Sequence, residues 1–388
     1  MKGSDAAALL VQGAFQAGEL PGAVIAAAGR DEAGFAQGFG VRRLGAPDPM
    51  TPETVVWIAS MTKAVTAVAA MRLVEAGRLS LDAPAAEVLP EIAEVPVLEG
   101  FDADGKALLR AAKRPVTLRH LLTHTSGFSY EMWSRPTIAA RKALGLPPMT
   151  SGKLAALRLP LLFDPGDAWH YGIGLDWAGR MVEAATGQRL GEHFAQTIFA
   201  PLGMTDTAFR LRDDMRARMA SVHARGPDGA LTPTDMVIEQ DPEFESGGGG
   251  LYSTARDYLA FARMILNGGR HGRDRLLKPA TVAMMAQDQI PRIAVQPMIS
   301  AMPAATNDAD FFPGQHCGWG LSFLVNRQPS PQGRSAGGLA WAGLANTYYW
   351  IDHGRGTTGI FISQVLPFFD AKAVGLFRQF EATLNGVG

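Results

Sequence analysis

A serine and a lysine three positions apart carry the clearest chemical signal in the sequence. Ser60 and Lys63 open an Ala-rich, apolar segment that predicts a helix over residues 60–76. Positions i and i+3 share one face of a helix, so this spacing lets the hydroxyl and the amine meet. A serine hydroxyl needs a base close by, and lysine serves as that base only where burial disfavours its charged form. The pattern predicts a nucleophile, a base and, at the helix start, free N–H groups for an oxyanion.

Three separated motifs follow one another along the chain, WIASMTKAVTAVA at residues 57–69, LLTHTSG at 121–127 and SGGGGLYST at 246–254. Together and in this order they resemble the class C β-lactamase and DD-peptidase superfamily and, within it, the family VIII carboxylesterases. The likeness extends from about residue 20 to residue 380. It implies a β-lactamase/transpeptidase-like fold of α/β plus all-α class, in which helices flank an antiparallel sheet and a helical domain is inserted.

The resemblance also implies which residues accompany Ser60 and Lys63. Tyr171, in the segment WHYG, takes the place of the family's tyrosine, which relays a proton between the serine and the lysine. A tyrosine beside an ammonium group can become a phenolate, so the sequence leaves open whether Lys63 or Tyr171 is the general base. The triplet WAG at 341–343 matches the family's K-T-G-like strand. The backbone N–H groups of Ser60 and Leu344 are therefore expected to form the oxyanion hole.

Two departures from the family pattern narrow the class of substrate that the site can bind. Tyr171 is followed by Gly172 and Ile173, where β-lactamases carry Tyr-x-Asn, and Trp341 stands where they carry lysine. These changes remove polar and charged groups that would hold the amide and carboxylate of a β-lactam or a peptide. A neutral, apolar ester therefore suits the predicted site better, with Trp341 as an apolar wall.

Further substrate-binding residues are expected close to Trp341 in sequence and in a second, separate wall of the pocket. Gly343 would permit close approach of the backbone to a substrate. Aromatic and sulfur side chains after the LLTHTSG motif would form a second wall, and these are Phe128, Tyr130, Met132 and Trp133. Ligand pockets are mostly apolar and aromatic, but the same residues are also typical of a local hydrophobic cluster, and the sequence does not decide between the two.

The predicted site indicates a serine carboxylesterase that hydrolyses small or medium apolar esters through an acyl-enzyme at Ser60. The alternatives are a β-lactamase or D-amino-acid peptidase, and a penicillin-binding protein that is acylated without turnover. Acyl transfer to an alcohol or amine would use the same intermediate. We expect no cofactor and no metal. The partner is a small-molecule ester, and the sequence indicates neither its chain length nor the oligomeric state.

Composition and charge narrow the class of protein. The 388 residues include 36 basic and 37 acidic side chains, so no basic excess indicates nucleic-acid binding and no polybasic run indicates membrane binding. No run of about 18 apolar residues exists to span a bilayer. The single cysteine, Cys317, excludes an intramolecular disulfide, and residues 1–20 resemble an amphipathic helix more than a signal peptide. We expect a cytoplasmic protein.

Strand predictions gather at the two ends of the chain. Apolar runs predict strands at 22–29, 35–41, 319–325, 339–342, 347–351 and 359–365, and periodic patterns predict helices at 4–18, 254–267 and 371–384. The stretch between them, with helices near 118–122 and 175–185, shows few strand signals. We expect an α/β domain built from residues 1–80 and 246–388, and a mainly helical domain at 81–245.

Four other features are weaker candidates for chemistry. Ser335 lies in a G-x-S-x-G sequence, but prolines precede it and a strand follows, which favours a hairpin loop over a nucleophile elbow. His120 and His124 have i, i+4 spacing but no adjacent Glu and no evident third zinc ligand. The tract at 247–250 lacks a following G-K-[ST], which favours close backbone packing over phosphate binding. Cys317 is expected as a small buried residue.

Overall fold

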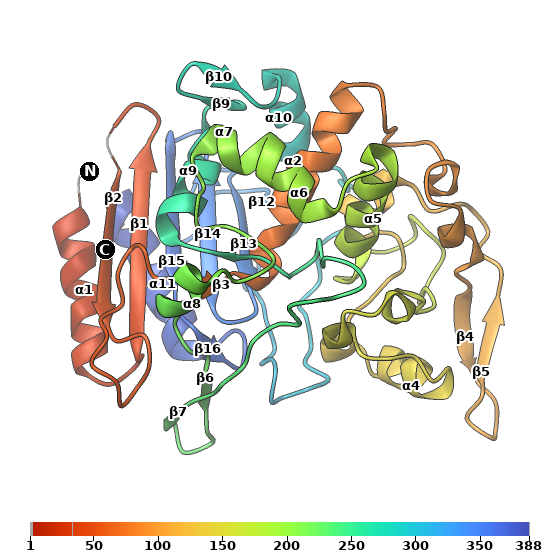
Figure 1. The fold of residues 1–388 in the computed structure, drawn as a ribbon, viewed down its shortest axis with the longest axis horizontal. Helices are drawn as coiled ribbons and strands as arrows, with labels where there is room; N and C mark the ends of the chain where they lie inside the picture. Colours follow the sequence, from red (N-terminus) through yellow and green to blue (C-terminus); the bar gives the residue numbers. More distant parts are fainter. Residues whose placement is uncertain (1–2, 33, 388) are drawn as a thin grey trace.

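A seven-stranded antiparallel sheet forms the centre of the computed structural model, which describes residues 3–32 and 34–387. The strand order is β11-β12-β13-β14-β15-β1-β2, so two strands from the start of the chain join five from its end (Figure 1). The strands of this sheet are β1 (Gly22–Gly29), β2 (Phe35–Gly40), β11 (Cys317–Trp319), β12 (Leu324–Asn326), β13 (Leu339–Gly343), β14 (Thr347–Asp352) and β15 (Thr357–Ile362). The sheet draws on both chain ends, as the sequence predicts.

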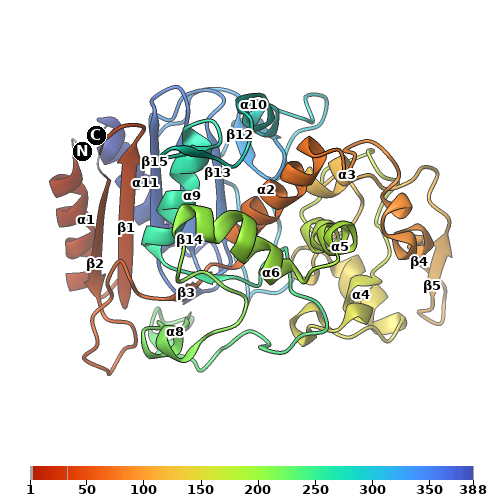
Figure 2. The ribbon, with the colours of Figure 1, turned by 45° about the horizontal axis from the view of Figure 1, so that its top comes forward.

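Helices cover both faces of this sheet (Figures 1 and 2). The longer helices are α1 (Ser4–Gln16), α2 (Thr62–Glu75), α5 (Gly174–Thr186), α9 (Ala255–Leu266) and α11 (Ala371–Asn385). Successive side chains of a strand point to opposite faces. In β14, Tyr348 therefore stacks on Phe377 of α11, with ring centroids 4.8 Å apart. The next residue, Tyr349, lies 5.3 Å from Tyr258 of α9 on the other face.

Two predicted strands differ from the structure. The prediction of one strand at 319–325 is wrong, because the chain turns back between β11 and β12. Gly320 N donates to Phe323 O at 2.8 Å, and Ser322 has a positive φ of 75°. The predicted strand at 359–365 divides into β15 and β16 (Val365–Leu366). Hydrophobic periodicity does not reveal a single residue that adopts the left-handed conformation and ends a strand.

The stretch 81–245, which the sequence predicts as mainly helical, also contains short strands. It contains the hairpin of β4 (Val97–Phe101) and β5 (Ala107–Arg110), and the pair β6 (His223–Arg225) and β7 (Leu231–Pro233). Strand β6 also pairs in parallel with β16, so the hydrogen bonding crosses the domain division that we predict at residue 245. These strands are too short for a two-residue periodicity to show in the sequence.

The remaining elements are short and connect or cover the main ones. They are β3 (Val56–Trp57), β8 (Tyr252–Ser253), β9 (Arg270–His271), β10 (Asp274–Arg275), α3 (Leu118–Leu122), α4 (Arg135–Ala143), α6 (Leu190–Phe194), α7 (Ala200–Leu202), α8 (Asp213–Ala217) and α10 (Pro279–Ala286). Across the residues that the structure describes, no helix has both the length and the apolar character needed to cross a bilayer.

Helix α2 runs through the middle of the molecule and packs against α5 (Figure 1). Its residues are almost all buried up to Leu73, which agrees with the apolar character of the segment. The α-helix begins at Thr62, after a 3-10 turn at Ala59–Met61. Ser60 therefore lies in that turn, and Lys63 lies in the first turn of the helix.

Candidate active site

The backbone immediately before Ser60 has a strained conformation. Ala59 has a φ of 45°, in the left-handed region that costs free energy for a residue with a Cβ atom. On one side, β3 pairs with β8, and Ile58 N donates to Leu251 O at 3.1 Å. On the other side, the chain enters α2. These two supports hold the turn that presents Ser60, and such strain is typical of functional sites.

The structure brings Ser60 and Lys63 together as the i, i+3 spacing predicts. Lys63 Nζ lies 3.1 Å from Ser60 Oγ. The same nitrogen lies 3.1 Å from the hydroxyl of Tyr130 and donates to the Gly248 carbonyl at 2.5 Å. The Lys63 side chain is fully buried, and this burial lowers its pKa to about 7, although the negative charge of Asp176 opposes the shift. A substantial fraction of Lys63 is therefore neutral near neutral pH.

Tyr171 lies next to Lys63 and Tyr130. Its hydroxyl oxygen accepts a hydrogen bond from Trp341 Nε1 at 3.1 Å. The centre of its ring is 4.8 Å from Lys63 Nζ. Burial raises the pKa of Tyr171 above its ordinary value, and the interactions of its hydroxyl with Ser60 and Trp341 oppose that rise. Tyr171 therefore keeps its proton over the physiological pH range.

Gly343 brings the backbone of β13 against the turn that carries Ser60. A Cβ atom on Gly343 would lie 2.2 Å from the carbonyl oxygen of Ile58 and 2.3 Å from Thr347 Oγ1. The close approach that the sequence predicts for Gly343 is thus made to the protein's own backbone. Gly343 and Leu344 both line the pocket that contains Ser60, where the N–H of Leu344 is expected to serve the oxyanion.

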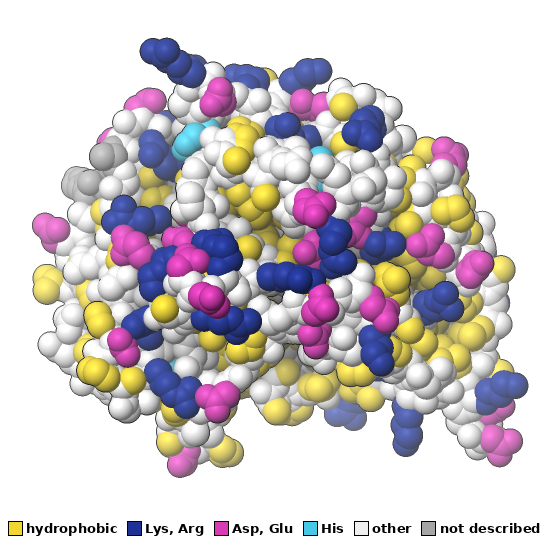
Figure 3. Space-filling view, viewed as in Figure 1, with side chains coloured by type: hydrophobic (Ala, Val, Ile, Leu, Met, Phe, Trp, Pro, Cys, Tyr) yellow, Lys and Arg dark blue, Asp and Glu magenta, His cyan; other side chains and the backbone are white. Residues whose placement is uncertain are grey.

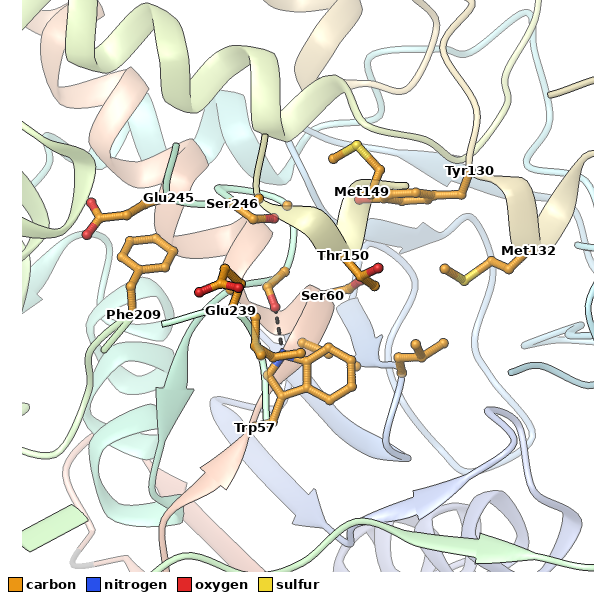
Figure 4. Close-up of a pocket in the computed structure, with 18 of the residues that line it drawn as sticks. Trp57, Ser60, Tyr130, Met132, Met149, Thr150, Phe209, Glu239, Glu245 and Ser246 are labelled. Atoms are coloured by element: carbon orange, nitrogen blue, oxygen red, sulfur yellow. Dashed lines mark hydrogen bonds between the residues drawn. The ribbon is translucent and has the colours of Figure 1, made fainter. Parts of the chain in front are cut away.

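Ser60 opens onto a mostly apolar pocket of about 160 Å³. Figure 4 shows Phe209 and Glu245 on one side of Ser60, and Tyr130 and Met132 on the other. The apolar lining residues are Trp57, Ala59, Tyr130, Met132, Trp133, Met149, Tyr171, Phe209, Ile238, Pro242, Phe244, Met298, Trp341, Ala342, Leu344 and Phe368. Such a lining suits a ligand held by its apolar surface.

Charged groups at the pocket offer little to an anionic substrate. The charged residues that line it, within the described part of the chain, are Arg210, Glu239 and Glu245. Arg210 is already paired with Asp241. Over the face in Figure 3, basic and acidic side chains are interspersed and form no patch of one sign. A neutral substrate fits this distribution better than a carboxylate.

Three of the predicted aromatic wall residues line the pocket, and one does not. Tyr130, Trp133 and Trp341 are lining residues. Phe128 is 1% exposed and stacks on Trp177 of α5, with ring centroids 5.8 Å apart. For Phe128 the alternative of a local hydrophobic cluster is therefore correct, because its ring is taken up by packing on Trp177 and does not reach the pocket.

The weaker candidates have structural roles. Ser335 lies in the loop between β12 and β13, where its backbone N–H donates to Asp352 Oδ2 at 2.7 Å. His120 caps α3 and accepts from Thr117 N through Nδ1. His124 accepts from Gly172 N at 3.4 Å, and its ring lies 4.7 Å from that of Tyr171.

Sequence reasoning missed two features of the site. Asp176, in the first turn of α5, is fully buried and lies 3.4 Å from the Tyr130 hydroxyl. The glycine tract at 246–250 supplies the Gly248 carbonyl to Lys63. A carboxylate between Leu175 and Trp177 in an apolar helix was the available signal, because buried acidic residues are rare unless they have partners.

Comparison with known proteins identifies the family. The model of the Beta-lactamase family matches residues 8–382 of the chain. The chain belongs to the beta-lactamase family. Monacolin J acid methylbutanoyltransferase of Aspergillus terreus is 35% identical over 382 residues, which cover 94% of this chain and 91% of that protein. Lovastatin esterase of Penicillium rubens is 35% identical over 379 residues, covering 92% of each chain.

A solved structure supports the same assignment. The LovD6 mutant of simvastatin synthase from Aspergillus terreus has a TM-score of 0.89 and 31% sequence identity to this chain, and the match covers 99% of this chain and 97% of that one. The β-lactamase/transpeptidase-like fold predicted from the sequence motifs is therefore confirmed. This beta-lactamase-family protein is an enzyme of the serine hydrolase class.

Proposed function

We propose that this protein hydrolyses small or medium apolar esters through an acyl-enzyme at Ser60. The observation that carries the proposal is the 3.1 Å contact between Ser60 Oγ and Lys63 Nζ at the edge of an apolar pocket. The lovastatin esterase among the relatives supports action on an ester. The reaction needs no cofactor, because the chain supplies the nucleophile, the base and the proton donor.

Lys63 is better suited than Tyr171 to be the base. Burial lowers the pKa of Lys63 to about 7 and raises that of Tyr171, so the amine is the group with a free lone pair near neutral pH. Ser60 passes its proton to Lys63, and its oxygen adds to the ester carbonyl. The N–H groups of Ser60 and Leu344 stabilise the resulting oxyanion.

Collapse of this intermediate releases the alcohol. Tyr171 protonates the departing alkoxide, and the ammonium of Lys63 replaces the proton that Tyr171 has given. Ser60 then carries the acyl group. Water repeats the sequence on the acyl-enzyme, which releases the carboxylic acid and returns the proton to Ser60.

The pocket favours an ester over a β-lactam. Trp341 and Ile173 occupy the positions at which β-lactamases of this type carry lysine and asparagine. The side chain of Arg210 is 54% exposed and pairs with Asp241, and the other charged residues of the described lining, Glu239 and Glu245, are acidic, so this lining offers no buried cation to the carboxylate of a β-lactam. These features also argue against a D-amino-acid peptidase and against a penicillin-binding protein, whose ligands carry the same carboxylate.

Acyl transfer is the second candidate function. A relative with 35% identity over 94% of this chain is named as a methylbutanoyltransferase. The same acyl-enzyme would react with an alcohol wherever that alcohol displaces water from the apolar pocket. Product analysis with an added apolar alcohol distinguishes the two, because transfer forms a new ester and hydrolysis forms only the acid.

The proposed function is tested with Ser60→Ala, with Ser335→Ala as the matched serine control, on a short p-nitrophenyl ester. We expect Ser60→Ala to lose about a thousandfold or more of kcat and the control to keep its activity. Mass spectrometry of the wild type should find the acyl group on the peptide that contains Ser60. Unchanged turnover by Ser60→Ala would refute the proposal. Faster turnover of a chromogenic cephalosporin than of the ester would select the β-lactamase alternative.

A further inference from the structure

Three oxygen atoms surround the buried amine of Lys63. Its Nζ is 3.1 Å from Ser60 Oγ. It is also 3.1 Å from the hydroxyl oxygen of Tyr130 and 2.5 Å from the carbonyl oxygen of Gly248. The side chain of Lys63 is 0% exposed, so these groups determine how the amine is oriented.

The number of donors and acceptors decides which way the amine points. A neutral amine has two N–H groups and one lone pair. The carbonyl oxygen of Gly248 only accepts, so it takes one N–H of Lys63. Ser60 needs the lone pair if Lys63 is to receive its proton. The second N–H must therefore go to the oxygen of Tyr130, which requires that Tyr130 donate its own proton elsewhere.

Asp176 accepts the hydrogen bond that Tyr130 donates. Its Oδ2 lies 3.4 Å from the hydroxyl of Tyr130. Its Oδ1 accepts from the Ser246 hydroxyl at 2.5 Å and from Gly248 N at 3.0 Å. Burial raises the pKa of Asp176, and the nearby Lys63 and the donors Ser246 and Gly248 oppose that rise. These partners favour the ionised carboxylate, which accepts hydrogen bonds and donates none. Tyr130 then donates to Asp176, and its oxygen accepts from Lys63.

We propose that Tyr130 and Asp176 are positioning residues that turn the lone pair of Lys63 toward the hydroxyl of Ser60. The inference rests on the proposed function, because it concerns the same proton transfer. Both residues act on the reaction through Lys63.

The packing leaves this arrangement little freedom. A Cβ atom on Gly248 would lie 2.4 Å from Asp176 Oδ2 and 2.8 Å from the Tyr130 hydroxyl, so only glycine lets the three groups approach. The rings of Tyr130 and Tyr171 lie 5.5 Å apart, which fixes the Tyr130 ring on its other side. Asp176 is held by α5 and is fully buried.

Asp176→Asn is expected to reverse this hydrogen-bond chain. The amide oxygen of asparagine can still accept from Ser246 and Gly248, but its N–H groups face Tyr130. Tyr130 must then accept from residue 176, and its hydroxyl proton turns to the lone pair of Lys63. The base is blocked, although the substitution changes the side chain's shape very little.

The test compares Asp176→Asn, Tyr130→Phe and the double variant in labelling of Ser60 by an uncharged p-nitrophenyl dialkyl phosphate. In this reaction Ser60 Oγ bonds to phosphorus, p-nitrophenolate leaves, and the serine proton passes to Lys63. Labelling is followed at about pH 9, where Lys63 is neutral in every variant and a shift of its pKa no longer affects the rate.

We expect the labelling rate constant to fall by about tenfold or more in Asp176→Asn and by about threefold in Tyr130→Phe. The double variant should label faster than Asp176→Asn alone, because loss of the hydroxyl frees the lone pair again. A purely structural role predicts losses that add. Additive losses, or wild-type rates in Asp176→Asn, would overturn the proposal.

Two buried residues outside the site provide matched controls. Asp257→Asn changes a carboxylate that bonds to Thr207, and Tyr348→Phe removes a hydroxyl that bonds to Asn346. Both should label within about twofold of wild type, and thermal unfolding of every variant checks the fold. Ester turnover is measured in parallel. If the variants label in the expected order but the wild type does not turn over the ester, the proposed function is refuted and this inference stands. If the wild type turns over the ester but the losses in labelling rate add, this inference is refuted and the proposed function stands.

Discussion

Trp341 donates the N–H of its indole to the hydroxyl oxygen of Tyr171 at 3.1 Å. The residue that replaces the lysine of related β-lactamases is thus both an apolar wall and a neutral hydrogen-bond donor. A hydroxyl oxygen that accepts from an indole keeps its own proton free to donate. This hydrogen bond supports the role of proton donor that we propose for Tyr171.

Trp341→Phe removes this donor and keeps most of the apolar ring. We expect kcat for a short p-nitrophenyl ester to fall by about three- to tenfold, as for the loss of one buried hydrogen bond, with KM within about twofold of wild type. Steady-state kinetics measure both constants. An unchanged kcat would show that the indole N–H has no part in orienting Tyr171.

The activity should depend on pH through the amine of Lys63. Burial lowers its pKa to about 7, and the groups that face it are Asp176, Tyr130, Tyr171 and His124. Because the neutral amine is the base, kcat/KM should rise with pH up to about 7 and then level off. A profile of initial rates on an uncharged ester checks this. Activity that falls as the pH rises through this range would contradict a neutral lysine base.

Gly343→Ala is expected to displace the oxyanion hole. The new Cβ would meet the carbonyl oxygen of Ile58 at 2.2 Å, and that atom is backbone and cannot rotate away. We expect kcat to fall by about tenfold or more. Gly375→Ala in α11 is the control, because no atom lies within 4 Å of its added Cβ. The control should keep full activity and equal or higher stability. Wild-type kcat in Gly343→Ala would show that β13 need not lie so close to Ile58.

The loop that carries Ser335 is anchored by a buried ion pair. Arg334 Nε and Nη2 bind the two carboxylate oxygens of Glu381 in α11 at 2.7 and 2.8 Å, and both side chains are nearly inaccessible. Glu381→Gln leaves the guanidinium charge uncompensated, so we expect the free energy of unfolding to fall by about 3–5 kcal/mol. Denaturant unfolding measures the change.

An exposed ion pair provides the comparison. Asp235 pairs with Arg43 at 2.9 Å, and the Asp235 side chain is 92% exposed. Asp235→Asn should therefore cost less than about 1 kcal/mol. A similar cost for Asp235→Asn and Glu381→Gln would mean that burial of the Arg334–Glu381 pair has no energetic consequence.

The residues with the clearest local signals were predictable. Ser60 and Lys63 are three positions apart on one continuous segment, so local geometry alone brings them together. The strand β1 is buried along its whole length and was predicted with its observed bounds. The role proposed for Tyr171 comes from the family motif and not from spacing, since Tyr171 lies 108 positions after Lys63.

The partners of Lys63 depend on contacts that no local pattern records. The sequence predicts Tyr130 only as a pocket wall, and the contact of its hydroxyl with Lys63 joins residues 67 positions apart in the chain. Asp176 and Gly248 come from a helix and a turn distant in the chain and meet only through packing. Residue types can indicate that a buried amine needs acceptors, but they do not identify which ones.

The sequence by itself determined the family, the antiparallel sheet built from both chain ends, and the pairing of Ser60 with Lys63 that we propose as nucleophile and base, because each is encoded in short-range spacing or in motifs of adjacent residues. Only the tertiary structure decided that Phe128 packs on Trp177, that Gly343 lies against Ile58, and how the amine of Lys63 is oriented. These are directions of side chains and close approaches between distant segments. They are set by how the segments pack, and the composition of each segment does not specify them.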